Sequence, residues 1–162
     1  RDLLLEIADR NGWLATVQKA QKKFEASKLS RTKEAATIDR LIASDPRNAN
    51  YRERRLAVYR GLAENAIASG NHIEARSIAL DGVKSVETVL RQGANVEHLI
   101  DMRIRFWVII AAAEKLSGKP WQASFEKSGT LINEHARKNP KFVKPAMRMR
   151  DGLWAHLIKQ EE

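Results

Sequence analysis

The chain has 162 residues, 43% hydrophobic and 30% charged, which is enough for one globular domain with a substantial core. Its formal net charge is +9, but the excess of Lys and Arg is spread evenly along the sequence, which disfavours nucleic-acid binding. There is no cysteine, which excludes disulfides, thiolate metal sites and a cysteine nucleophile, and slightly favours the cytoplasm over the periplasm.

The sequence predicts helices throughout, because apolar residues recur at spacings of three, four and seven and no strand pattern competes. The predicted bounds are about 2–28, 30–44, 49–69, 71–92, 95–118, 120–138 and 143–160. Ser30 is the predicted N-cap of the second helix, and Asn71 with Glu74 is the predicted capping box of the fourth. Gly70 and Gly118 are predicted to end the third and fifth helices.

Two of these helices have distinctive apolar patterns. The first is amphipathic, with Leu3, Ile7, Leu14 and Val17 among its apolar positions. The fifth contains an almost unbroken apolar run, 106–113. A helix that is apolar all round has no face for water, so we expect the fifth helix to have neighbours on both sides. Its run is too short for a bilayer, which takes about 20 apolar residues, and we predict no membrane span.

Landmarks along the chain repeat with a period of about 47 residues. Large aromatic residues are 46, 48 and 47 positions apart, at Trp13, Tyr59, Trp107 and Trp154. Breaks at Pro46, Gly93 and Pro140 keep the same spacing. The unit is a hairpin of two helices whose apolar face only the next hairpin can cover. We therefore predict a single helical-repeat domain over 1–162, with hairpins at about 2–45, 49–92 and 95–138 and a capping helix at 143–160.

Residue types recur at matching places in two of the units. These places hold Tyr59, Leu62, Ala63, Gly70 and Ala75 in the second unit, and Trp107, Ile110, Ala111, Gly118 and Ala123 in the third. This pattern resembles the tetratricopeptide repeat, although the units exceed that family's usual length of about 34 residues. The resemblance, to a divergent long-helix relative, implies an all-α right-handed solenoid. It also implies a non-catalytic module that binds a peptide or partner domain in a groove, within a bacterial signalling or regulatory protein.

Residues for catalysis or metal binding form no recognisable pattern. The four histidines never stand three or four apart on one helix, as ligands of one metal often do. The sequence contains no nucleophile motif, phosphate-binding loop or dinucleotide fingerprint. We therefore predict a protein that is not an enzyme and that needs neither a cofactor nor a metal.

Basic residues are the main candidates for binding. Three arginines each stand four residues before a repeat aromatic, where the guanidinium lies beside the ring one turn on. The family's groove positions add three more cations, and the full set is Arg55, Arg60, Arg103, Arg105, Lys115 and Arg150. Stacking on the rings is the structural interpretation; the functional one is recognition of an acidic peptide or a carboxylate terminus. Around the last helix, Lys141, Lys144 and Arg148 add a basic run that no acidic residue interrupts.

Two other functions stay open at this point. One is a basic helical repeat on nucleic acid, which would lose affinity steeply with salt. The other is a sensor or dimerisation arm, in which an exposed end hairpin forms a homodimer. Because the chain begins at Arg1 and not at Met, we expect it to belong to a larger protein.

Overall fold

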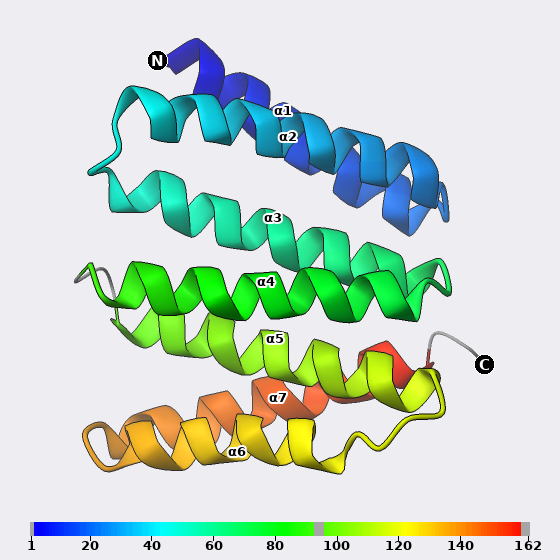
Figure 1. Ribbon diagram of the computed structural model, residues 1–162, viewed down its shortest axis with the longest axis vertical. Helices are drawn as coiled ribbons and strands as arrows, with labels where there is room; N and C mark the ends of the chain where they lie inside the picture. The colour runs from blue at the N-terminus through cyan, green and yellow to red at the C-terminus, as the bar shows by residue number, and fades with distance from the viewer. Residues whose placement is uncertain (1, 93–95, 160–162) are drawn as a thin grey trace.

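The computed structural model describes residues 2–92 and 96–159, and these form seven α-helices and one 3-10 helix with no strand. The helices are α1 (Asp2–Ala20), α2 (Phe24–Ser44), α3 (Ala49–Ala68), α4 (His72–Leu90), α5 (Val96–Leu116), α6 (Gln122–Ala136) and α7 (Val143–Ile158), with η1 (Pro140–Phe142) before α7. From α1 to α6 each helix packs on the next, and α7 turns back against α5 and α6 (Figure 1). The predicted all-α class is confirmed, and the array is consistent with a helical repeat.

The first turn lies earlier than the sequence predicts. Helix α1 ends at Ala20 and α2 begins at Phe24, so the prediction of one helix to residue 28 is wrong. The reversal uses Lys22, whose φ of 58° is in the left-handed region without the glycine that usually signals such a turn. Ser30 is consequently not an N-cap. It is buried inside α2, where its hydroxyl donates to Oε1 of Gln18 at 2.8 Å.

The turns that are marked in the sequence by a glycine or a capping residue lie where the sequence predicts them. Gly70 and Gly118 follow α3 and α5 with φ of 77° and 69°. Asn71 caps α4, since its Oδ1 accepts from the backbone N–H of Glu74 and its Nδ2 donates to the Glu74 carboxylate at 2.7 Å. The predicted break at Gly93 and the predicted start of a helix at 95 lie outside the described residues.

Helix α5 is the centre of the largest apolar cluster described. It contacts α3, α4, α6 and α7, and between Ile104 and Ala113 all residues are buried except Arg105 and Trp107, which are half-buried. Gly82 of α4 lies directly against the ring of Phe106, and no side chain would fit between them. The prediction that this helix has neighbours on both sides is confirmed. Among the described helices none is long and apolar enough to cross a bilayer.

Helix α1 packs in a different way. Its buried residues are the small ones, Ala8, Gly12 and Ala15. Beneath it an ion pair within α2, Arg31 to Glu34 at 2.7 Å, lies between two glycines. A Cβ at Gly12 would be 2.6 Å from the Glu34 carboxylate, and a Cβ at Gly61 of α3 would be 2.6 Å from the Arg31 guanidinium. These glycines therefore make room for charged side chains between three helices.

Candidate binding cleft between α5 and α7

The six cations predicted as a binding set are not gathered in one groove. Five of them form ion pairs with carboxylates of the chain: Arg55 with Asp39 (2.9 Å), Arg60 with Glu64 (3.6 Å), Arg103 with Glu87 (2.7 Å), Arg105 with Asp101 (2.8 Å) and Arg150 with Asp151 (2.8 Å). Each partner carboxylate competes with an acidic ligand for its cation. Lys115 is exposed and lies near aromatic rings instead.

The predicted stacking of arginines on the repeat aromatics is found for Arg55, whose guanidinium lies 4.5 Å from the centre of the Tyr59 ring. Arg150 lies over a different ring, Phe125, at 4.8 Å. The Trp107 ring is covered by Lys127 of α6, whose Nζ is 4.2 Å from its centre. Spacing along one helix correctly places a cation one turn from a ring, but neighbouring helices supply competing partners.

An aromatic cluster joins α7 to the start of α6. Trp121 stacks on Trp154 with ring centres 4.7 Å apart, and Phe125 lies 4.8 Å from Trp154. The Lys115 ammonium is 5.3 Å from the Trp121 ring and 5.4 Å from the Trp154 ring. Trp154 follows the 47-residue period of the sequence, whereas Trp121 falls outside it and carried no signal. Lys115 thus belongs to a cation–aromatic contact at the C-terminal end of α5.

Three of the predicted arginines line separate clefts. Arg105 lines a cleft of about 610 Å³ between α5 and α7. Arg60 lines one of about 180 Å³ among α1, α2 and α3, and Arg55 one of about 440 Å³ among α2, α3 and α4. These clefts share no lining residue, so a single short ligand does not reach all three arginines.

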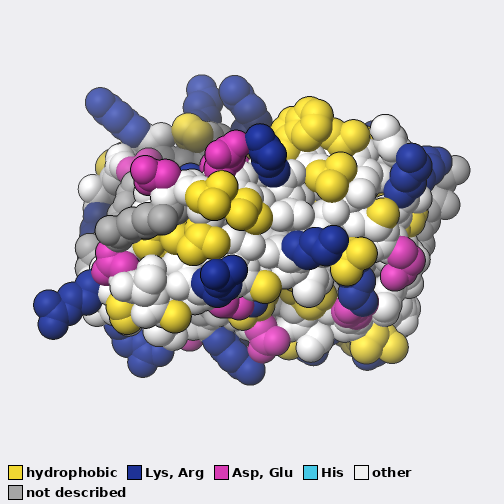
Figure 2. All heavy atoms as spheres, turned by 90° about the horizontal axis from the view of Figure 1, so that it is seen from above, with side chains coloured by type: hydrophobic (Ala, Val, Ile, Leu, Met, Phe, Trp, Pro, Cys, Tyr) yellow, Lys and Arg dark blue, Asp and Glu magenta, His cyan; other side chains and the backbone are white. Residues whose placement is uncertain are grey.

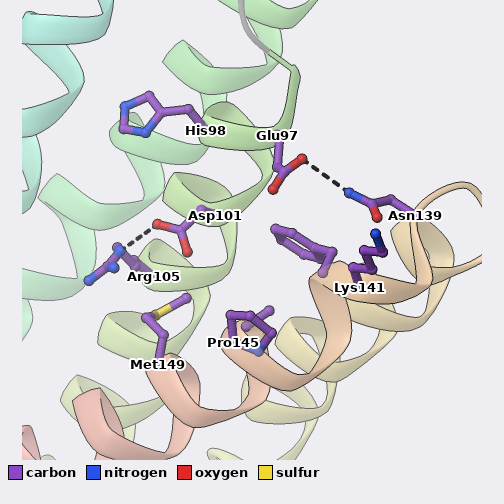
Figure 3. Close-up of a pocket in the computed structure, with 10 residues that line it drawn as sticks. Glu97, His98, Asp101, Arg105, Asn139, Lys141, Pro145 and Met149 are labelled. Atoms are coloured by element: carbon purple, nitrogen blue, oxygen red, sulfur yellow. Dashed lines mark hydrogen bonds and ion pairs between the residues drawn. The ribbon is translucent and has the colours of Figure 1, made fainter.

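The cleft between α5 and α7 exists because the chain reverses sharply after α6. Pro140 starts η1, and the turn of η1 brings α7 back against α5. The buried ring of Phe142 anchors the turn, with its centre 4.6 Å from that of His135. Asn139 Nδ2 donates to Glu97 Oε2 of α5 at 3.2 Å and so ties the rim of the cleft to α5. Figure 3 shows the α5 side chains on one side and those of the turn and α7 on the other.

Both polar and apolar groups line this cleft. The α5 side contributes Asp101 and Arg105, in which Arg105 Nε donates to Asp101 Oδ2 at 2.8 Å and both side chains are about one-quarter exposed (26% and 27%). The opposite side contributes Pro145 and Met149 of α7 as apolar contact surface. Lys141, also on that side, is exposed and makes no ion pair with any residue that the structure describes.

The sequence carries no signal for the apolar residues of the cleft. Pro145 and Met149 belong to no motif, and only the fold places them opposite α5. Lys141 had a signal, since it opens the basic run around the last helix.

Away from the cleft, one lysine has a shifted pKa. Lys28 Nζ donates to Glu74 Oε1 at 2.6 Å, and this hydrogen bond raises the pKa of Lys28 above its ordinary value against the opposing effect of burial.

Comparison with known proteins returned no matching family model, no matching curated protein and no matching solved structure. Within the described ranges, no group of three or more His, Asp or Glu side chains is placed to hold a metal ion. The cleft presents apolar area beside charged groups at its edge.

Proposed function

We propose that the protein is a non-catalytic binding module that takes a short segment of a partner protein in the cleft between α5 and α7. The observation that carries the proposal is the pairing of apolar surface, Pro145 and Met149, with a cation, Lys141, that no described carboxylate neutralises. A ligand with one apolar side chain and a neighbouring carboxylate matches both features at once.

The overall charge of the chain favours an acidic ligand, although the carboxylates of Glu97 and Asp101 also line the cleft. The net charge of +9 raises the rate at which an acidic segment meets the protein. Within the cleft, Arg105 has its Nε–H on Asp101, and a guanidinium has four further N–H donors. The Asp101 contact fixes the position of Arg105, so less side-chain freedom is lost when a ligand carboxylate binds.

The proposal extends to the class of repeat. We infer a divergent, long-helix relative of the tetratricopeptide array, wound in a right-handed sense, that acts within a larger bacterial signalling or regulatory protein. Support comes from the 47-residue period, from the paired helices and from the glycine turns after α3 and α5.

Synthetic peptides test the cleft directly. The probe is a set of fluorescent nine-residue peptides with a central Leu flanked by Glu, beside a matched set in which Lys replaces each Glu, read by fluorescence anisotropy. We expect the Glu set to bind and the Lys set not to bind. Lys141→Glu and Met149→Asp should each weaken binding about tenfold, or about 1.4 kcal/mol, because each removes one of the two matched features.

Lys33→Glu is the matched control, since Lys33 is exposed on α2 and undergoes the same charge reversal away from the cleft. It should leave peptide affinity unchanged, and circular dichroism should show that all three variants stay folded. Equal losses for Lys33→Glu and Lys141→Glu would reduce the interaction to net charge, and no binding of the Glu set would reject the proposed function.

A further inference from the structure

Helix α1 presents an apolar stripe on the outside of the stack. Leu3, Ile7 and Leu14 are 66%, 37% and 43% exposed, and Trp13 beside them is 72% exposed. Because α1 turns its small residues toward its neighbours, the larger apolar side chains are the ones left in water. Figure 2 looks onto this end of the molecule and shows hydrophobic groups gathered between charged side chains.

The stripe has the spacing of a helix–helix seam. Its members follow at intervals of four, three, four and three residues: Leu3, Ile7, Arg10, Leu14 and Val17. This is the alternation of a and d positions in a heptad, with one charged residue among four apolar ones. It runs along most of a helix of 19 residues, which is long enough to pack along a second helix of similar length.

The opposite end of the stack lacks such a stripe. Every exposed residue of α6 except Ala123 is polar: Gln122, Glu126, Lys127, Thr130, Asn133 and Glu134. A polar outer face is what keeps the last unit of a helical stack soluble and single. The outer face of α6 is therefore polar, as at the end of a helical stack, whereas the outer face of α1 is apolar, as at an interface.

We propose that α1 pairs antiparallel with α1 of a second copy of this chain, about a two-fold axis that passes between Ala8 and Asp9. In this arrangement Leu3 lies opposite Leu14 of the second copy, and Ile7 lies opposite Arg10. The same patch serves both chains, as a two-fold interface requires.

The charges on the stripe favour an antiparallel second copy of the chain as the partner of α1. Glu6 and Arg10 form an exposed ion pair at 2.8 Å, with side chains 58% and 79% exposed. Antiparallel pairing brings Glu6 of each chain beside Arg10 of the other, so both can pair crosswise. Parallel pairing would instead place Arg10 directly beside Arg10 of the second copy, and these like charges repel. The stripe is thus self-complementary in one orientation only.

Sedimentation equilibrium on the whole chain tests the pairing. We expect the mass to rise with concentration from the 18.4 kDa of one chain to twice that value. Leu14→Glu should abolish the rise. The control is Ile73→Glu, because Ile73 is an equally apolar residue, 75% exposed, at the start of α4. A wild-type chain that stays monomeric up to about 1 mM overturns the proposal.

A charge exchange tests the crosswise contact. Glu6→Arg alone and Arg10→Glu alone should each prevent self-association, because each puts like charges opposite one another. An equimolar mixture of the two variants should dimerise, since every crosswise pair is then of opposite sign. A mixture that stays monomeric contradicts the arrangement, and circular dichroism distinguishes that outcome from misfolding.

Disulfide formation reports the register, because the wild-type chain contains no cysteine. Leu3→Cys mixed with Leu14→Cys should cross-link under mild oxidation, whereas Leu3→Cys alone should not. Cross-linking of Leu3→Cys with itself would indicate parallel pairing and reject the proposal. Lys141→Glu should not change the dimer, which separates this interface from the peptide cleft.

Discussion

Helices α1 and α5 are both first helices of a hairpin, with 19 and 21 residues, yet their side chains have opposite environments. In α5 the large residues are inside, from Ile104 through Phe106 to Ile110. In α1 only small residues are buried and Leu3, Trp13 and Leu14 are exposed. The cause is position in the stack: α5 is enclosed by α3, α4, α6 and α7, whereas α1 packs mainly on α2 and touches α3 only slightly.

The two regions are consequently held together by different interactions. Around α5, rings and branched chains bury apolar area, which is the largest favourable contribution to folding. Around α1, the contacts are close approaches of small residues together with polar ones, such as the Ser27 hydroxyl that donates to the Ala15 carbonyl at 2.8 Å. We expect the α1–α2 hairpin to open before the region around α5, because less apolar surface holds it.

The largest expected effect is a difference in the free energy of unfolding when one aromatic residue is truncated in each of the two regions. Phe106→Ala should lower the free energy of unfolding by about 3–5 kcal/mol, because Phe106 is fully buried at the contact of α4 and α5. Trp13→Ala should change it by no more than about 0.5 kcal/mol, because Trp13 is 72% exposed. Urea unfolding at low protein concentration measures both. Similar losses for the two variants would show that α1 is packed as tightly as α5.

A smaller difference in stability is expected when two helical glycines are each replaced by alanine. Gly82→Ala should cost about 1–3 kcal/mol, since its methyl group would overlap the Phe106 ring, which has no room to move. Gly12→Ala should be close to neutral. Its methyl group would meet the end of the flexible Glu34 side chain, and alanine gains about 1 kcal/mol over glycine within a helix. Thermal melts of the two variants should differ clearly, and a larger loss for Gly12→Ala would reverse this view of the packing.

The smallest effect concerns the ion pair that links α2 to α4. A double-mutant cycle of Lys28→Met and Glu74→Gln should give a coupling near the lower end of about 0.2–1 kcal/mol, because the side chains are 44% and 31% exposed. The pKa of Lys28 is raised above its ordinary 10.5 in the folded protein. The coupling should therefore be complete between neutral pH and that value, and disappear as pH rises through the raised pKa. A coupling that persists at higher pH would mean that charge is not its origin.

For the candidate site, the sequence identified the charged residues of the cleft better than the apolar ones. Arg105 stood out as a charge that interrupts an apolar helix, and Lys141 as the start of a basic run. Met149 and Pro145 were not identified, because an apolar residue on a helix usually belongs to the core. Only the reversal at η1, which brings α7 back to α5, makes them part of a surface.

The sequence alone determined the helical class, the seven helices and the turns after α3 and α5, because periodicity and left-handed glycines act within a few residues. It did not reveal the turn at Lys22, where packing of α1 on α2 overrides the absence of glycine. The tertiary structure alone decided which apolar stripe became core and which stayed exposed. Burial depends on how many neighbours a helix has, and a helix's own sequence does not contain that number.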